Sequence, residues 1–251
     1  MSEAPPPGAR ADYGIDAPGV VLRFVLIAAG ALLLGTVLRV ALADQHHLLA
    51  RSLFRAGVIT ALWCTGSAAV MVWGSKVGKL RLRDRVLDGL ALRGDERLLD
   101  VGCGRGLLLI GAAKRLPSGR AVGLDKWQKE DQSGNAPEVT LANARAEGVA
   151  ERIELQTGDM RQLPFEPGSF DVVVSSWALH NLYDAEGREQ AIAEIVRVLK
   201  PGGRVALIDI QHATAYSGQL RALGLEDVQL SRPNYLFVIP THTVTARKPA
   251  A

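Results

Sequence analysis

The sequence predicts an α/β domain with a mostly parallel sheet, preceded by a hairpin of two membrane-spanning helices. Two long apolar stretches lie within the first 75 or so residues. The remaining part, about 160 residues, is long enough to bury a core and alternates short apolar runs with charged, helix-like segments, a pattern typical of α/β folds. A glycine-rich turn at 102–106 follows the first of these runs.

The predicted organisation begins with a disordered tail at 1–19, because this segment is rich in Pro, Ala and Gly and has no hydrophobic periodicity. A transmembrane hairpin at 20–74 follows. Its first apolar stretch, Phe24 to Ala43, has twenty residues, which match the ~30 Å hydrocarbon core at ~1.5 Å of rise per residue. Its second, Ala56 to Trp73, has eighteen residues without a charge.

The distribution of basic residues predicts the orientation of the hairpin across the membrane. The expected loop, Asp44 to Arg55, holds Arg51 and Arg55, whereas five basic residues follow the second stretch directly: Lys76, Lys79, Arg81, Arg83 and Arg85. Because cytoplasmic flanks carry the excess of Lys and Arg, we expect a multi-pass membrane protein whose globular part is cytoplasmic. The net charge of +3 is concentrated at this flank, which argues for a lipid bilayer and against nucleic acid as partner.

Two other interpretations of the apolar stretches stay open. The first stretch resembles a signal peptide in position, although it is too long for a signal core. Both stretches would also suit two buried helices of a soluble domain. After them, residues 75–95 are expected to form a basic amphipathic juxtamembrane helix that lies on the membrane, packs on the globular domain, or does both. The two cysteines, Cys64 and Cys103, indicate neither a disulfide nor a metal site.

The glycine-rich turn is the first sign of a ligand site. A short apolar run, Arg97 to Val101, contains Asp100 and leads into Gly102, Gly104 and Gly106, after which a helix-like segment begins. Glycines at such a turn let the backbone approach a nucleotide closely.

Polar residues end the next strands as well. Asp125 ends the second predicted strand, and an acid there can accept hydrogen bonds from both ribose hydroxyls. The third strand, 153–156, leads to Asp159 and the fourth, 170–174, leads to Ser175. Three more strands are expected at 205–210, 228–230 and 235–246; a Pro-Gly-Gly turn precedes the first of them, and Pro233-Asn234 links the last two.

These motifs together resemble a class I S-adenosylmethionine-dependent methyltransferase, of the type 11, ubiquinone/menaquinone methyltransferase-like group. The matching pieces are LLDVGCGRG at 98–106, AVGLDKW at 121–127, TGDMRQLPFEPGSFDVVVSSWALHNL at 157–182 and EIVRVLKPGGRVALIDI at 194–210. The resemblance implies a Rossmann-like, seven-stranded, mostly parallel sheet with a C-terminal antiparallel β-hairpin, formed by residues 96–251, and S-adenosylmethionine as cofactor.

The resemblance also implies roles for particular residues. The amino-acid part of the cofactor would be held by Asp100, Gly102 and Gly104, and the ribose by Asp125. Trp127 or Lys126 would flank the adenine, Met160 would pack on it, and Asp159 would accept a hydrogen bond from its amino group. Ser175 would lie beside the cofactor.

His180 is the candidate catalytic base, because a neutral imidazole just past the fourth strand can take a proton near pH 7. A local packing role for His180 stays open, as does a core role for Trp177. The expected pocket walls are 76–92, 128–137 and 181–188, and the first of these adjoins the membrane. We therefore expect a small, hydrophobic or amphiphilic acceptor, and no metal.

Two alternatives to a methyltransferase remain at this stage. A nicotinamide-dependent oxidoreductase shares the glycine turn and the ribose acid but not the fourth-strand and C-terminal features. A non-catalytic, membrane-anchored cofactor-binding or scaffold protein would keep the fold without the reaction. The sequence gives no indication of the oligomeric state.

Overall fold

The computed structural model describes residues 11–127 and 135–250, which divide into two units. One unit is Ile15–Gly78, and the other contains the remaining described residues. Each unit has its own packing.

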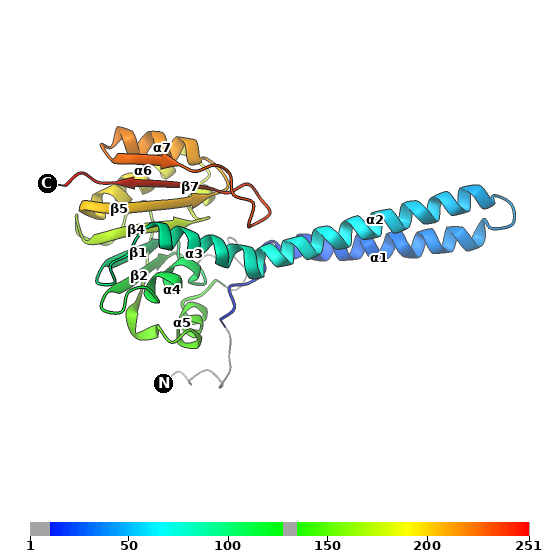
Figure 1. Ribbon diagram of the computed structural model, residues 1–251, viewed down its shortest axis with the longest axis horizontal. Coiled ribbons are helices and arrows are strands. Elements are labelled where there is room, and N and C mark those ends of the chain that lie inside the picture. The colour runs from blue at the N-terminus through cyan, green and yellow to red at the C-terminus, as the bar shows by residue number, and fades with distance from the viewer. Residues whose placement is uncertain (1–10, 128–134, 251) are drawn as a thin grey trace. The chain divides into compact units, whose positions relative to one another are not determined.

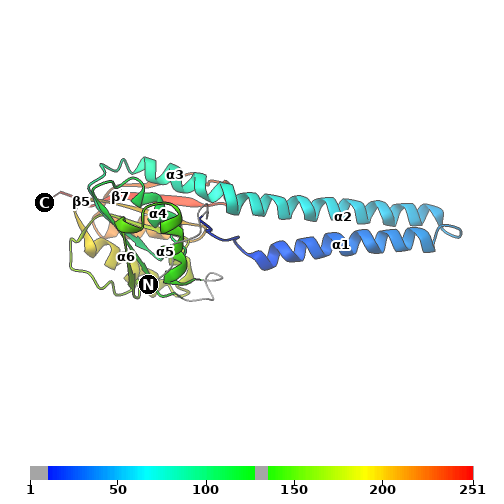
Figure 2. The same ribbon diagram turned by 90° about the horizontal axis from the view of Figure 1, so that it is seen from below.

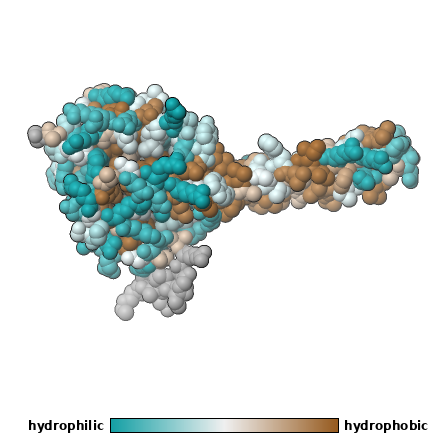
Figure 3. Space-filling model, in the orientation of Figure 1, coloured by the Kyte–Doolittle hydropathy of each residue, from teal (hydrophilic) through white to brown (hydrophobic). Residues whose placement is uncertain are grey.

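The first unit is a helical hairpin (Figures 1 and 2). It comprises α1 (Pro18–Ala41), α2 (His47–Trp73) and a π-helical turn, η1 (Gly74–Gly78). The two long helices approach closely at Gly57, where a Cβ atom would lie 2.5 Å from the carbonyl oxygen of Ala31. Both helices are long and apolar enough to cross a membrane, and only 11% and 17% of their most apolar windows are buried. Figure 3 shows apolar surface along much of the hairpin.

Two expectations about this part of the chain are wrong. The expected loop at 44–55 is mostly helical, because α2 already begins at His47. The expected tail at 1–19 is ordered over its described part: Tyr13 is buried and α1 begins at Pro18. Residues 1–10 of that tail lie outside the described residues.

The second unit is built on a seven-stranded sheet of order β3-β2-β1-β4-β5-β7-β6 (Figure 1). The strands are β1 (Arg97–Val101), β2 (Arg120–Asp125), β3 (Ile153–Thr157), β4 (Phe170–Ser176), β5 (Leu199–Asp209), β6 (Glu226–Leu230) and β7 (His242–Arg247). The first five run parallel, whereas β7 is antiparallel to both β5 and β6. The predicted mostly parallel sheet with a C-terminal antiparallel hairpin is confirmed.

Helices cover both faces of this sheet. On one face, α3 (Lys79–Gly89), α4 (Leu107–Ala113) and α5 (Pro137–Ala146) pack in one hydrophobic cluster with β-strand side chains. On the other face, α6 (Ala185–Val198) and α7 (Ala213–Ala222) form a second cluster. Short 3-10 turns, η2 (Ala150–Arg152) and η3 (Leu179–Asn181), complete the fold.

The expected juxtamembrane helix at 75–95 corresponds to η1 and α3 and ends at Gly89. Its apolar side chains Leu82, Val86 and Leu87 are buried in the globular domain. Packing on the domain, one of the placements expected for this helix, is therefore observed.

The C-terminal strands differ from prediction at two points. The Pro-Gly-Gly turn lies inside β5 as an irregularity, since Leu199 pairs with Phe170 before the regular register resumes at Arg204. The last strand begins at His242 rather than Tyr235, because its partner β5 ends where Asp209 pairs with His242. Residues 231–241 instead form a loop with a single bridge, Asn234 to Thr241.

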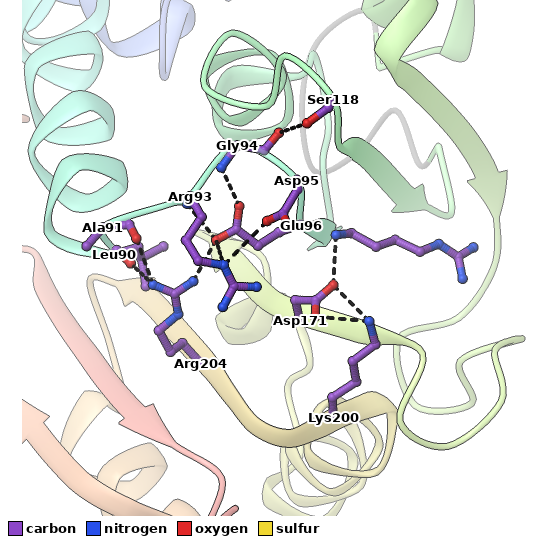
Figure 4. A network of polar contacts seen from close by, with 11 residues as sticks. Leu90, Ala91, Arg93, Gly94, Asp95, Glu96, Ser118, Asp171, Lys200 and Arg204 are labelled. Atoms are coloured by element: carbon purple, nitrogen blue, oxygen red, sulfur yellow. Dashed lines mark hydrogen bonds and ion pairs between the residues drawn. The ribbon is translucent and has the colours of Figure 1, made fainter.

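A polar network closes the N-terminal edge of the sheet (Figure 4). The buried carboxylate of Glu96 accepts from the backbone amides of Arg93 and Gly94, each at 2.8 Å, and pairs with Arg204 at 2.8 Å. Asp171 accepts from the Arg97 amide and from the Lys200 amine, both at 2.9 Å. The carboxylates of Glu96 and Asp171 are thus engaged in internal contacts, whereas the predicted ligand residues lie at the opposite edge of the sheet.

Candidate active site

The glycine turn between β1 and α4 lies at the C-terminal edge of the sheet. Gly102, Gly104 and Gly106 all have positive φ, at 74°, 48° and 86°. A Cβ atom on Gly102 would lie 2.3 Å from the Cβ of Ala178. The turn therefore requires glycine there for both conformation and space.

Asp125, at the end of β2, lies against this turn. One carboxylate oxygen accepts from the Gly104 amide at 2.8 Å. The other accepts from the Trp127 amide at 2.7 Å and from the Asn135 side chain at 3.1 Å. The predicted ribose acid and the predicted glycine cradle are thus in direct contact.

Asp100 lies beneath the turn and is 2% exposed. Its Oδ2 accepts from the Leu109 amide at 2.9 Å, while its buried Oδ1 has no hydrogen-bond partner among the described residues. Burial, with the charge of Asp125 nearby, raises the pKa of Asp100 to about 7. An unsatisfied buried acceptor at a backbone cradle suits a ligand that brings a donor.

Asp159, expected on the adenine side, is held by two cationic side chains. Asp159 pairs with Lys126 at 2.8 Å and with Arg161 at 2.7 Å. The bond from Arg161, followed by that from Lys126, holds the pKa of Asp159 below its usual range despite partial burial. Trp127 donates its indole N–H to Thr157 at 2.9 Å. The Asp159 carboxylate is therefore engaged with cations in this structure, and an adenine amino group would share it with them.

Met160 and Ser175 lie beside the glycine turn. The methyl carbon of Met160 is 3.6 Å from where a Cβ on Gly102 would stand. The buried Ser175 hydroxyl donates to the carbonyl of Val101 at 2.8 Å. This hydrogen bond joins Ser175 to the end of β1, so its role is structural.

The catalytic candidate His180 is held by a carboxylate that the sequence analysis did not single out. Asp209, at the end of β5, accepts from His180 Nδ1 at 2.6 Å and from the His180 backbone amide at 3.2 Å. Tyr216 donates its hydroxyl to the same carboxylate at 3.2 Å. Burial and this carboxylate raise the pKa of Tyr216 well above its usual range, so its hydroxyl keeps its proton.

Trp177 and Phe237 form an aromatic pair in this region. Their ring centroids are 4.4 Å apart with an interplanar angle of 30°. Trp177 directly follows β4 and has a φ of 51°, while Phe237 belongs to the loop at 231–241. Of the three expected pocket walls, the segment 128–137 is described only from 135 onward, because 128–134 lie outside the described residues. Phe237 belongs to none of the three expected walls.

Sequence reasoning missed Asp209 although a signal was present. Asp209 is an acid that ends an apolar strand, VALIDI, in the same manner as Asp125 ends β2. Phe237 was missed because the loop that carries it was interpreted as strand. Among the described residues, no group of His, Cys, Asp and Glu side chains suits a metal ion.

Fold and site together define a class I S-adenosylmethionine-dependent methyltransferase. The seven-stranded sheet has the predicted antiparallel hairpin, and the cofactor's expected residues converge at one edge. The glycine cradle that a Cβ would fill and the unsatisfied Asp100 oxygen both fit S-adenosylmethionine, whose amino-acid part carries donors and whose ribose suits Asp125.

Comparisons with known proteins agree. Residues 99–207 match the family model of the methyltransferase domain. A demethylmenaquinone methyltransferase of Lactobacillus johnsonii is 32% identical over 61% of this chain and 58% of its own length. A 27-O-demethylrifamycin SV methyltransferase of Amycolatopsis mediterranei is 37% identical over 51% and 44%. The chain thus spans less than two thirds of either relative, and it carries a methyltransferase domain of this family.

Solved structures share the fold. An S-adenosylmethionine-dependent methyltransferase from Aquifex aeolicus has a TM-score of 0.53 at 18% identity, covering 68% of this chain and 93% of its own. The [4+2]-cyclase SpnF has a TM-score of 0.57 at 23% identity, covering 68% and 82%.

Proposed function

We propose that this protein is a membrane-anchored methyltransferase that transfers the methyl group of S-adenosylmethionine to a small, hydrophobic or amphiphilic acceptor. The observation that carries the proposal is the convergence at one sheet edge of the cofactor cradle, formed by the glycine turn and Asp125, with the His180–Asp209 pair.

The cofactor supplies an electrophilic methyl group on a sulfonium. The chain must therefore align a nucleophile and, where that nucleophile is a hydroxyl, remove its proton. Asp209 accepts the Nδ1–H of His180, which leaves Nε2 of the neutral ring as the proton acceptor. Asp209 also orients the ring, so it is a positioning residue and His180 is the catalytic base.

Three features support an apolar acceptor. The hairpin presents two helices of membrane-spanning length. The Trp177–Phe237 pair provides aromatic side chains, and Trp177 lies just before His180 in the sequence. A relative named for demethylmenaquinone, a quinone, belongs to the same family. The positive flank after α2 supports an orientation in which both hairpin ends and the methyltransferase domain are cytoplasmic.

Two other functions fit parts of the site. A nicotinamide-dependent oxidoreductase would share the glycine turn, but the family match favours methyl transfer. The fold also occurs in a [4+2]-cyclase, SpnF, which is a precedent for another function on the same architecture. The intact His180–Asp209 pair favours an active enzyme.

Calorimetric titration of the detergent-solubilised full chain with S-adenosylmethionine and, separately, NAD tests the cofactor assignment. We expect binding of S-adenosylmethionine alone. Binding of NAD without S-adenosylmethionine would exclude the proposed function. Labelling of a cysteine introduced at Asp44, in the turn between α1 and α2, tests the orientation: a membrane-impermeant reagent should reach it only from outside the cell.

A further inference from the structure

The segment at residues 11–14, which precedes α1, is bound to the methyltransferase domain, and we call it the N-terminal strap. The Asp12 backbone amide donates to Asn143 Oδ1 at 2.8 Å, and Asn143 Nδ2 donates back to the Asp12 carbonyl at 3.0 Å. Asn143 lies in α5 and is 5% exposed. This reciprocal pair of hydrogen bonds joins the strap backbone to α5.

The strap also holds Arg105, which lies between Gly104 and Gly106 in the cofactor turn. Arg105 donates to the Asp12 carbonyl at 3.0 Å and pairs with the Asp12 carboxylate at 3.2 Å. Asn143 Nδ2 reaches the backbone carbonyl of Arg105 at 3.0 Å. The side chain of Arg105 is therefore tied to the strap, and its backbone carbonyl to Asn143, the residue that also holds Asp12.

The other end of the strap is closed by a buried amine. Lys79, 3% exposed at the start of α3, donates to the carbonyls of Tyr13 and Gly14 at 2.8 and 3.2 Å. The Tyr13 side chain is buried in the same cluster as Leu82 and Val86. A buried charge and a buried ring hold this segment far more firmly than its composition suggests.

We propose that Asp12 and Asn143 are positioning residues for the cofactor, which hold the glycine turn in its binding conformation through Arg105. The inference rests on the proposed function. Three glycines with positive φ have wide conformational freedom, so an untethered turn would populate other shapes. A ligand's apparent affinity falls in proportion to the fraction of protein in the competent shape, and the strap raises that fraction.

The test uses the full chain in detergent, with Asp12→Ala and Asn143→Ala as variants. Asp88→Asn is the matched control, since it breaks the ion pair of Arg115 with Asp88 at 2.7 Å, which joins α3 to the end of α4. Three measurements are made on each protein: the Kd for S-adenosylmethionine by calorimetry, hydrogen exchange of the amides at 102–107, and the Tm.

We expect Asn143→Ala, which removes the bonds to both Asp12 and Arg105, to bind the cofactor about tenfold more weakly. Asp12→Ala, which loses only the carboxylate that faces Arg105, should bind it about threefold more weakly, and both variants should show faster exchange at 102–107 while the control stays within about twofold. Asp12→Asn, which keeps the acceptor for the Gly14 amide but loses the charge facing Arg105, should be intermediate. A purely structural role would lower the Tm and leave the Kd of the folded protein unchanged.

The inference is overturned if both variants fold, bind the cofactor within twofold of the unsubstituted chain and exchange these amides at the same rate. That result leaves the proposed function intact. Failure of the unsubstituted chain to bind S-adenosylmethionine would instead reject the proposed function and, with it, the cofactor role of the strap.

Discussion

Replacing Asp209 by Asn is the sharpest perturbation of the proposed catalytic pair. Asp209 is 1% exposed, and its carboxylate accepts hydrogen bonds at both oxygens. Oδ1 accepts from His180 Nδ1 and the Ile210 amide at 2.6 and 2.7 Å. Oδ2 accepts from the His180 amide and the Tyr216 hydroxyl, both at 3.2 Å. An asparagine must turn its own donor toward one of these two sets.

The expected magnitudes follow from that geometry. Losing a buried, charge-assisted hydrogen bond should lower the free energy of unfolding by about 1.5–3 kcal/mol. An NH2 group that faces Nδ1 would reverse the tautomer of His180, so Nε2 would carry the proton and could not act as a base. General base catalysis contributes about 10²–10⁴-fold, so we expect a rate loss of at least about 100-fold.

The assay is single-turnover transfer of labelled methyl from S-adenosylmethionine in membranes containing the full chain. His180→Ala should match Asp209→Asn in rate. Tyr216→Phe, which removes only the hydroxyl contact, is the control and should lose about 1 kcal/mol of stability with little change in rate. Folded Asp209→Asn and His180→Ala variants that keep the normal rate would refute the base assignment.

Three further predictions concern the cofactor turn and the opposite edge. The pKa of Asp100 is raised to about 7 in the folded chain, so ionisation opposes folding, and the free energy of unfolding should fall as pH rises from about 4 to about 7; denaturant titrations should show that this slope flattens in Asp100→Asn. Gly102→Ala forces a Cβ to within 2.3 Å of Ala178 at a positive φ and should lower stability by roughly 2–5 kcal/mol, seen as a lower Tm, with loss of cofactor binding by calorimetry. Glu96→Gln weakens the pair with Arg204 and the amide contacts, which should lower the Tm but leave the cofactor Kd unchanged; a changed Kd would contradict the assignment of this edge to stability alone.

Much of the sheet and of the cofactor cradle was predictable from local patterns. Short apolar runs mark buried parallel strands, and a polar residue at the end of each run marks the edge where ligands bind. Asp125 and Gly104 were expected at the same edge on this basis, and the Gly104 amide nitrogen lies 2.8 Å from the Asp125 carboxylate.

Features that depend on distant partners were not predictable. Alternation from Tyr235 onward suggests a strand, yet the strand begins at His242 because pairing stops where β5 ends. The strap has the composition of a disordered tail, and its order comes from Arg105 and Asn143, about a hundred residues away. The partnership of His180 with Asp209 likewise requires two strand ends to be brought together by the fold.

Membranes containing the full chain, incubated with radiolabelled S-adenosylmethionine and then partitioned into lipid, protein and aqueous fractions, test the central claim most directly. We predict that label enters the organic-extractable fraction and that His180→Ala abolishes this transfer. Label confined to water-soluble products, or to protein, would contradict a hydrophobic acceptor, and no transfer to any fraction, with the cofactor bound, would contradict the assignment as a methyltransferase.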